Sequence, residues 1–289
     1  MKQIRRSLPL AVLSLLILQA SAFCSADFKF VNYIGEAQAK LTYCGELGIG
    51  MELLGYQEHV ANVSIGGPAG NIDSSASPNY YSVNGRLEMA MGNAIYAVAA
   101  HFPLSASPVT EKWTFNGGDY QTNDLSYTLT RFDACGGYSF SDLFQLLGGI
   151  RISKGEQTRE NFYQNGSRLS TGQVVETIDS FNALVKLRGM MEPGPVRFGY
   201  ELEAAYPIKV STVNTQLSGL ELGASGDSYA AAVTLSCDLD PGSSIDGAIR
   251  WSTVHYDGSG WHAYGAGQVQ WPINDTQDLG ISAGWRHRF

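Results

Sequence analysis

The sequence predicts an all-β protein, an antiparallel transmembrane β-barrel of about 12 strands, within a range of 10 to 12. Three observations predict it. Apolar and polar residues alternate along most of the chain, glycine and tyrosine are abundant (33 and 15 of 289 residues), and only 16% of the residues are charged. Alternation gives a strand two unlike faces. Abundant small and aromatic residues suit closely packed strands, so one barrel domain is expected.

The first 26 residues have the features of a secretory signal peptide. Lys2, Arg5 and Arg6 precede an apolar run over residues 8–18, and small residues follow near Ala22 and Ala26, as a cleavage site requires. We therefore expect residues 27–289 to form the exported protein, as a single barrel domain. No later stretch reaches the 18 or so apolar residues of a spanning helix, so any membrane crossing is expected to use strands.

Eleven segments of the exported part alternate, and residues 196–208 do so most clearly. There Val196, Phe198 and Tyr200 begin one face, while Arg197 and Glu201 lie on the other. The alternating segments are residues 42–53, 81–91, 95–102, 127–138, 144–152, 181–191, 196–208, 229–239, 245–251, 261–271 and 279–289. Single-chain barrels of this kind have an even number of strands. We therefore add a twelfth strand at residues 213–222, with a bulge at Ser218 and Gly219.

Two kinds of connection separate these segments. Residues 92–94, 139–142, 192–195 and 240–244 are short and rich in turn-forming residues, whereas residues 54–79, 104–124 and 155–172 are long and polar. Short turns on one rim and long loops on the other are typical of outer-membrane barrels. With twelve strands, the turn at 240–244 falls on the long-loop side and residues 256–260 on the short-turn side.

The polar faces carry charges of both signs, whereas the opposite faces are apolar and end in aromatic residues such as Tyr81, Tyr138 and Tyr206. In a membrane barrel the apolar faces meet lipid and the charges line the lumen. The charged residues expected to line the lumen are Glu46, Glu52, Arg86, Glu88, Arg131, Asp133, Arg151, Lys186, Arg188, Arg197, Glu201, Glu203 and Arg250. The alternative is a secreted soluble barrel that binds a small ligand, with the apolar faces inside.

The last strand carries the most specific pattern. Leu279, Ile281, Trp285 and Phe289 occupy alternate positions, and Phe289 is the final residue. This pattern resembles the closing strand of bacterial outer-membrane β-barrel proteins. The resemblance implies localisation in the outer membrane of a Gram-negative cell, contact with outer-membrane lipid, and recognition by the barrel-assembly machinery. It names an architecture and no particular functional family.

The sequence favours a non-enzymatic role. A barrel of this size has a narrow lumen, so we expect either a porin-like channel for a small solute or a structural and surface-interaction protein. An outer-membrane hydrolase of lipase or protease type is the alternative. The sequence singles out no catalytic residues for it. The histidines considered for a rim site are His59, in a loop with Asp73 and beside the loop of Asp119 and Asp124, and the pair His255 and His262, for which an interfacial cross-strand pair is the commoner explanation.

Composition and motifs argue against other partners. The net charge of −8 is unfavourable for nucleic acid, because neutralising phosphates requires a basic surface. The cysteines have none of the spacings of zinc sites, and no phosphate-binding or dinucleotide-binding motif occurs. We therefore expect neither a metal nor a cofactor.

Overall fold

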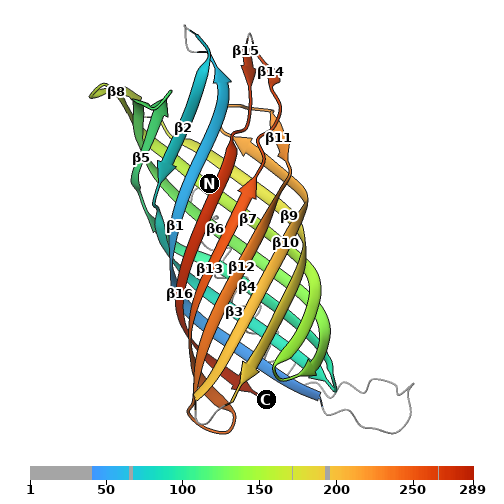
Figure 1. The fold of residues 1–289 in the computed structure, drawn as a ribbon. Coiled ribbons are helices and arrows are strands. Elements are labelled where there is room, and N and C mark those ends of the chain that lie inside the picture. Colours follow the sequence, from blue (N-terminus) through green and yellow to red (C-terminus); the bar gives the residue numbers. More distant parts are fainter. Residues whose placement is uncertain (1–40, 65–67, 171, 193–195, 266) are drawn as a thin grey trace.

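The structure is a computed structural model that describes residues 41–289 except 65–67, 171, 193–195 and 266. The predicted signal peptide, residues 1–26, lies outside the described part. Within that part there is no helix long and apolar enough to span a membrane. The described chain is a single tall barrel of antiparallel strands (Figure 1).

Ten long strands form the wall of the barrel. They are β1 (Leu41–Val63), β3 (Asn79–Met91), β4 (Ala94–Ser107), β6 (Gly118–Ser141), β7 (Phe144–Gln164), β9 (Val174–Met191), β10 (Val196–Asn214), β12 (Gly226–Asp238), β13 (Ser243–Tyr256) and β16 (Ile273–Arg288). Each pairs with its neighbours in this list, and β16 closes the ring by pairing with β1 from Cys44↔Arg288 to His59↔Ile273. Closure removes both sheet edges, so every long strand is paired on both sides.

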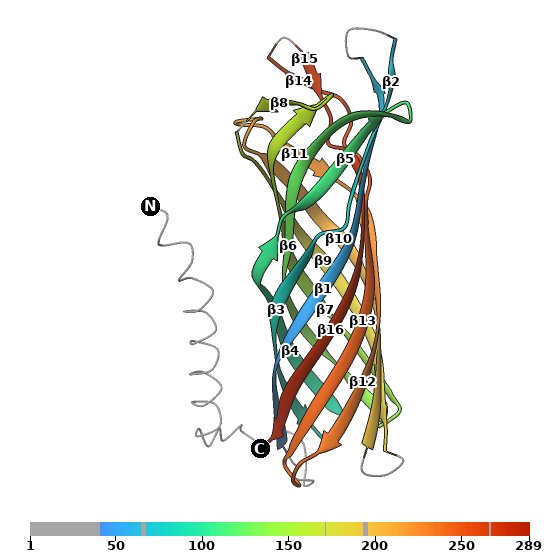
Figure 2. The same cartoon turned by 90° about the vertical axis from the view of Figure 1, so that its left-hand side faces the viewer.

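Six short strands are added at one end, which we call the loop end. They are β2 (Gly70–Ala76), β5 (Val109–Phe115), β8 (Ser167–Ser170), β11 (Glu221–Ala224), β14 (His262–Tyr264) and β15 (Gly267–Val269). The opposite end, the turn end, holds the C-terminus and the tight connections after β3, β6 and β12 (Figures 1 and 2). This asymmetry of short turns and long connections was predicted from the sequence.

The wall has ten strands, the lower bound of the predicted range, so the preferred number of twelve is wrong. Residues 261–271 alternate in sequence but form the β14–β15 hairpin, which pairs only with itself at the loop end. Residues 213–222 are the end of β10, a turn, and the start of β11. With ten strands, the connection at 240–244 lies at the turn end and residues 256–260 lie at the loop end, the reverse of the twelve-strand expectation.

The long polar segments also differ from the prediction of loops. Residues 54–79, 104–124 and 155–172 are largely strand, because β1, β6 and β7 continue beyond the apolar band and the short strands β2, β5 and β8 pair with these extensions. The wall strands therefore extend well past the membrane at the loop end.

Alternation places apolar side chains outside and polar ones inside. On β1, Leu47, Ile49 and Leu53 are exposed on the outer surface (44%, 66% and 40%), whereas Glu52 is buried in the lumen. Beyond Leu53 the next side chains on the outward face of β1 are those of Gln57 and His59. Residues 41–53 at about 3.3 Å each, tilted by about 45°, span about 28 Å, which matches the hydrocarbon thickness. The soluble-barrel alternative, with apolar faces inside, is therefore overturned.

The outer band ends in aromatic residues at both rims. Tyr138, Phe144 and Phe198 are exposed near the turn end, and Tyr81 and Tyr206 near the upper limit of the band. The predicted closing-strand residues Leu279, Ile281 and Trp285 of β16, and Phe289 directly after it, are all exposed on the outer surface. His287 lies in the same row and stacks on Trp285, with ring centroids 5.4 Å apart. Rings at both interfaces of an apolar band are typical of membrane barrels.

Candidate functional site

The lumen is the first candidate site, because alternation directs the charged face of each wall strand into it. Its hub is Glu203 on β10. Arg151 on β7, Lys186 on β9 and Arg250 on β13 approach its carboxylate to 2.6, 3.2 and 3.1 Å. Arg151 is also paired in a bidentate way with Asp133 of β6, at 2.7 and 2.8 Å. Buried ions need such partners because burial removes them from water.

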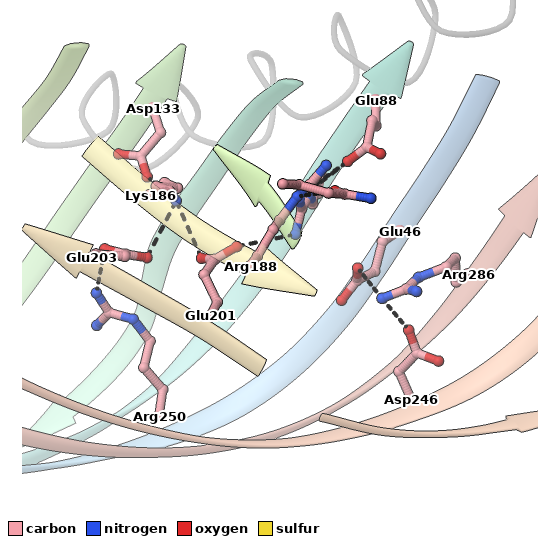
Figure 3. A network of polar contacts seen from close by, with 12 residues as sticks. Glu46, Glu88, Asp133, Lys186, Arg188, Glu201, Glu203, Asp246, Arg250 and Arg286 are labelled. Atoms are coloured by element: carbon pink, nitrogen blue, oxygen red, sulfur yellow. Dashed lines mark hydrogen bonds and ion pairs between the residues drawn. The ribbon is translucent and has the colours of Figure 1, made fainter. Parts of the chain in front are cut away.

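Lys186 joins the hub to the next carboxylates. Its ammonium lies 2.9 Å from Asp133 and 3.3 Å from Glu201 (Figure 3). Three cations thus meet Asp133, Glu201 and Glu203 in one continuous network. Shared partners of this kind fix the side-chain positions more firmly than isolated pairs do.

Other ion pairs cross the lumen from one wall to another. Arg86 on β3 lies 3.6 Å from Glu201 on β10, and these two strands are diametrically opposite in the ring of ten. Arg188 on β9 reaches Glu88 on β3 at 2.7 Å, between strands four places apart. Side chains that meet across the lumen from opposite walls leave little space for a solute to pass.

A second level of crossing lies toward the loop end. Arg131 on β6 is 3.4 Å from Asp278 on β16, again four places apart. Beside it, Ser82 donates a hydrogen bond of 3.0 Å to Glu52, and the ring of His101 lies 3.0 Å from the Tyr80 hydroxyl. Toward the turn end, Arg286 lies between Glu46 and Asp246, at 3.2 and 2.7 Å (Figure 3). Arg197 pairs with Asp238 at 2.6 Å near that rim.

All thirteen charged residues expected in the lumen lie on the inward registers of the wall strands. Five further charged residues are buried inside the barrel and were not predicted from the sequence: Asp278 and the loop-end residues Glu58, Glu111, Arg159 and Glu176. The last four fall in or beside segments predicted as loops. Extending the registers of the neighbouring segments 42–53 and 144–152 would have placed Glu58 on the same face as Glu52, and Arg159 on the same face as Arg151.

A layer of apolar and tyrosine side chains lies inside the barrel above Arg131, toward the loop end. Leu54, Tyr56, Tyr80, Leu125 and Tyr127 form one buried cluster inside the barrel. Tyr56 and Tyr127 meet edge to face with centroids 5.5 Å apart. A cavity of about 190 Å³ lies below this layer among the mid-barrel charges, and one of about 220 Å³ lies at the loop end; they share no lining residue.

Arg159 of β7 contacts residues of β1 and β5 at the loop end, above that layer. Its guanidinium lies 2.8 Å from Glu111 of β5 and 3.0 Å from Glu58 of β1, and 5.4 Å from the centre of the Trp113 ring. The Tyr56 hydroxyl donates to Glu58. Burial raises the pKa of Glu58 to about 7, although Arg159 opposes this rise.

Glu176 on β9 has different partners. It is 6% exposed and accepts hydrogen bonds from the Trp271 indole at 3.0 Å and the Asn214 amide at 3.2 Å. Among the described residues no Lys, Arg or His forms an ion pair with it. Glu176 and Arg159 both line the 220 Å³ cavity.

The histidines considered for a hydrolytic site lie on the outer wall. His59 is 2.6 Å from Asp73, as the sequence suggested, but in the described part of the chain its ring contacts neither Asp119 nor Asp124. His255 bonds to Asp275 at 2.7 Å, which raises the pKa of His255, and does not meet His262. Both rings are on outward registers, away from the loop-end cavity.

Comparison with known proteins identifies the fold. No family model matches the chain, and no curated protein matches it in sequence. Among solved structures, the outer membrane protease OmpT from Escherichia coli is similar with a TM-score of 0.68 and 10% identity, over 90% of this chain and 99% of that chain. The translocator domain of the autotransporter NalP from Neisseria meningitidis (TM-score 0.36, 10% identity, 96% and 98% covered) and Neisserial surface protein A (0.31, 8%, 84% and 97%) also match.

The chain therefore has the fold of bacterial outer-membrane β-barrel proteins, which confirms the class inferred from the closing strand. The fold and the apolar band together give the localisation, the outer membrane. In such barrels the short turns are periplasmic and the long connections extracellular, so the turn end is periplasmic and the loop end extracellular.

Proposed function

We propose that this chain is a closed, non-enzymatic outer-membrane barrel that acts at its extracellular end as a surface-interaction protein, and that it is not a porin-like channel. The observation that carries the proposal is the pairing of Arg86 with Glu201 across the full width of the lumen. The apolar layer around Tyr56 and Leu125 supports it, because it separates the mid-barrel cavity from the extracellular one. The Arg86 and Glu201 side chains are only 28% and 20% exposed, and ion pairs that are largely withdrawn from water are costly to separate, so they favour a permanently filled lumen.

The rim histidines support the non-enzymatic part of this proposal. His59 and His255 are held by carboxylates on outward registers, whereas a general base must reach the group from which it takes a proton. The outer wall supplies the remaining partners: we propose that lipid contacts the apolar band and that the barrel-assembly machinery recognises the strand ending at Phe289.

A swelling assay tests the closed lumen. Liposomes that contain the purified, folded protein are expected to swell in isotonic sugars and amino acids at the rate of protein-free liposomes. An open porin reconstituted at the same protein-to-lipid ratio serves as the positive control. Swelling that rises with protein content and falls with solute size would contradict the proposal and favour the porin-like channel.

A further inference from the structure

The extracellular cavity combines apolar walls with polar atoms that lack partners. It has a volume of about 220 Å³ and lies between β1, β7, β9 and β10 under two loop-end connections. Ligand sites for drug-sized molecules measure roughly 300–1,000 Å³, so the occupant is small. The cavity is bounded on one side by Leu217, Leu220 and Leu222 and on another by the Trp113 and Trp271 rings.

Its polar lining is rich in acceptors. Glu176 is a buried carboxylate bonded only to neutral donors among the described residues. On β10, Asn214 is directly opposite Glu176 in the ladder, and Thr212 is two residues farther along the same inward face. The Thr212 hydroxyl is in a side chain only 3% exposed and lines the cavity, yet it has no hydrogen-bond partner in the described part of the chain; the Gln270 carbonyl oxygen is in the same situation.

Carboxylates outnumber cations around the cavity. Glu58, Glu176 and Arg159 line the cavity; Arg159 forms ion pairs with Glu58 and with Glu111 of β5, and attracts Glu176 without an ion pair. A buried carboxylate without a cation is unfavourable. An occupant that donates hydrogen bonds and carries a positive charge would satisfy Glu176, Thr212 and Gln270 together.

Hydrogen bonds hold two loop-end connections next to the cavity. One joins β10 to β11, and the other joins β13 to β16 and carries β14 and β15. The Trp271 amide donates to Ser259 at 2.8 Å, which pins the base of the segment that carries β14 and β15. Thr215 and Val175 exchange bonds of 3.0 and 2.9 Å at the start of the other. The Tyr264 hydroxyl donates to the Gln216 carbonyl at 3.4 Å, so the two connections contact each other at the loop end, where Figures 1 and 2 show β11, β14 and β15.

From this arrangement we propose that the extracellular cavity binds a small organic ammonium group on an apolar stem. The ammonium donates to Glu176, Thr212 and Gln270, and the stem packs against the leucines and Trp271. The inference rests on the proposed surface function, which it extends by naming the chemistry of the partner. Two sources carry this chemistry, a free small amine and the lysine side chain of a peptide.

The experiment is a calorimetric titration of the full folded barrel in detergent micelles, with empty micelles as the blank. Phenethylamine is the free-amine probe, and a lysine residue blocked at both ends represents the peptide source. 2-Phenylethanol has the same stem without the charge. We expect at least one of the two cationic probes to bind, and binding of 2-phenylethanol to be at least tenfold weaker than that of phenethylamine if the free amine is the ligand. The cationic probe that binds more tightly identifies the source.

Two variants locate the binding. Glu176→Gln keeps the shape of the side chain and Thr212→Val removes only the hydroxyl; each is expected to weaken binding of the cationic probe at least tenfold. The matched controls are Glu156→Gln and Thr177→Val, because both residues lie on outward registers of the wall. Retention of a heat-dependent shift in gel mobility verifies that each variant is folded.

The inference is overturned if neither cationic probe binds, if phenethylamine binds but no more tightly than 2-phenylethanol, or if the cavity variants bind as the wild type does. These results would leave the closed lumen intact, because the swelling assay measures it separately. Swelling above the lipid background would contradict the proposed function whatever the titration shows.

Discussion

Replacing Glu203 with alanine is expected to lower the free energy of unfolding by about 3–5 kcal/mol, as measured for other buried ion pairs that lose one partner. Arg151, Lys186 and Arg250 lie within 3.2 Å of this carboxylate, and the side chain of Glu203 is 5% exposed. Arg151 and Lys186 keep other partners, whereas among the described residues Arg250 keeps only a neutral bond to Ser252. Urea unfolding of the protein in lipid vesicles, followed by tryptophan fluorescence, measures the change.

The matched control is Glu221→Ala. Glu221 is 58% exposed and its partner Lys209 is 73% exposed, with 3.7 Å between the charged atoms. Exposed pairs contribute about 0–1 kcal/mol, so this variant is expected to unfold like the wild type. Equal unfolding curves for the two variants would show that Glu203 does not hold the network together.

Replacing Arg159 with methionine is expected to make the stability of the extracellular end strongly dependent on pH. Glu58 and Glu111 would lose their shared cation while remaining buried. Arg159 lowers the pKa of Glu58 in the wild type, so its removal raises that pKa beyond about 7. A folded-state pKa above the unfolded value stabilises the fold below the unfolded pKa, and that contribution is lost as the pH rises through the folded pKa.

The deficit relative to the wild type is therefore expected to be small at pH 5 and to grow to several kcal/mol at pH 8. Thermal unfolding at pH 5, 6.5 and 8 measures it. Lys154→Met is the control, because Lys154 is 50% exposed and pairs with the exposed Glu156. A deficit that is the same at all three pH values would mean that the loss comes from packing and not from the buried carboxylates.

The sequence predicts the wall of the barrel well because each wall strand has lipid on one face and a polar lumen on the other. It fails at 261–271, where Trp261 and Trp271 sustain an alternating pattern that reflects a hairpin outside the membrane. It also fails at 54–63 and 155–164, which continue as strand. There the outward positions face water, so Gln57 and His59 are as polar as the inward Glu58, and hydropathy no longer alternates.

The candidate site is predicted only in part, for a related reason. Period two directs Arg86 and Glu201 inward, but they are 115 positions apart in the sequence, and only the closed ring of ten strands brings them together. The Arg159 cluster combines β1, β5 and β7. Its members could not be grouped without knowing that their strands continue past the membrane. The unpartnered hydroxyl of Thr212 has no signature in the sequence at all.

Single-channel recording in a planar lipid bilayer tests the closed lumen most directly, because it detects passages that admit only ions. The purified, folded protein in 1 M salt, inserted under conditions in which a known porin gives steps, is expected to give none above the lipid background over the voltages that the bilayer withstands. Uniform, protein-dependent steps that change in size when Arg86 and Glu201 are both replaced by serine would show that ions pass between these side chains, and would contradict the closed barrel.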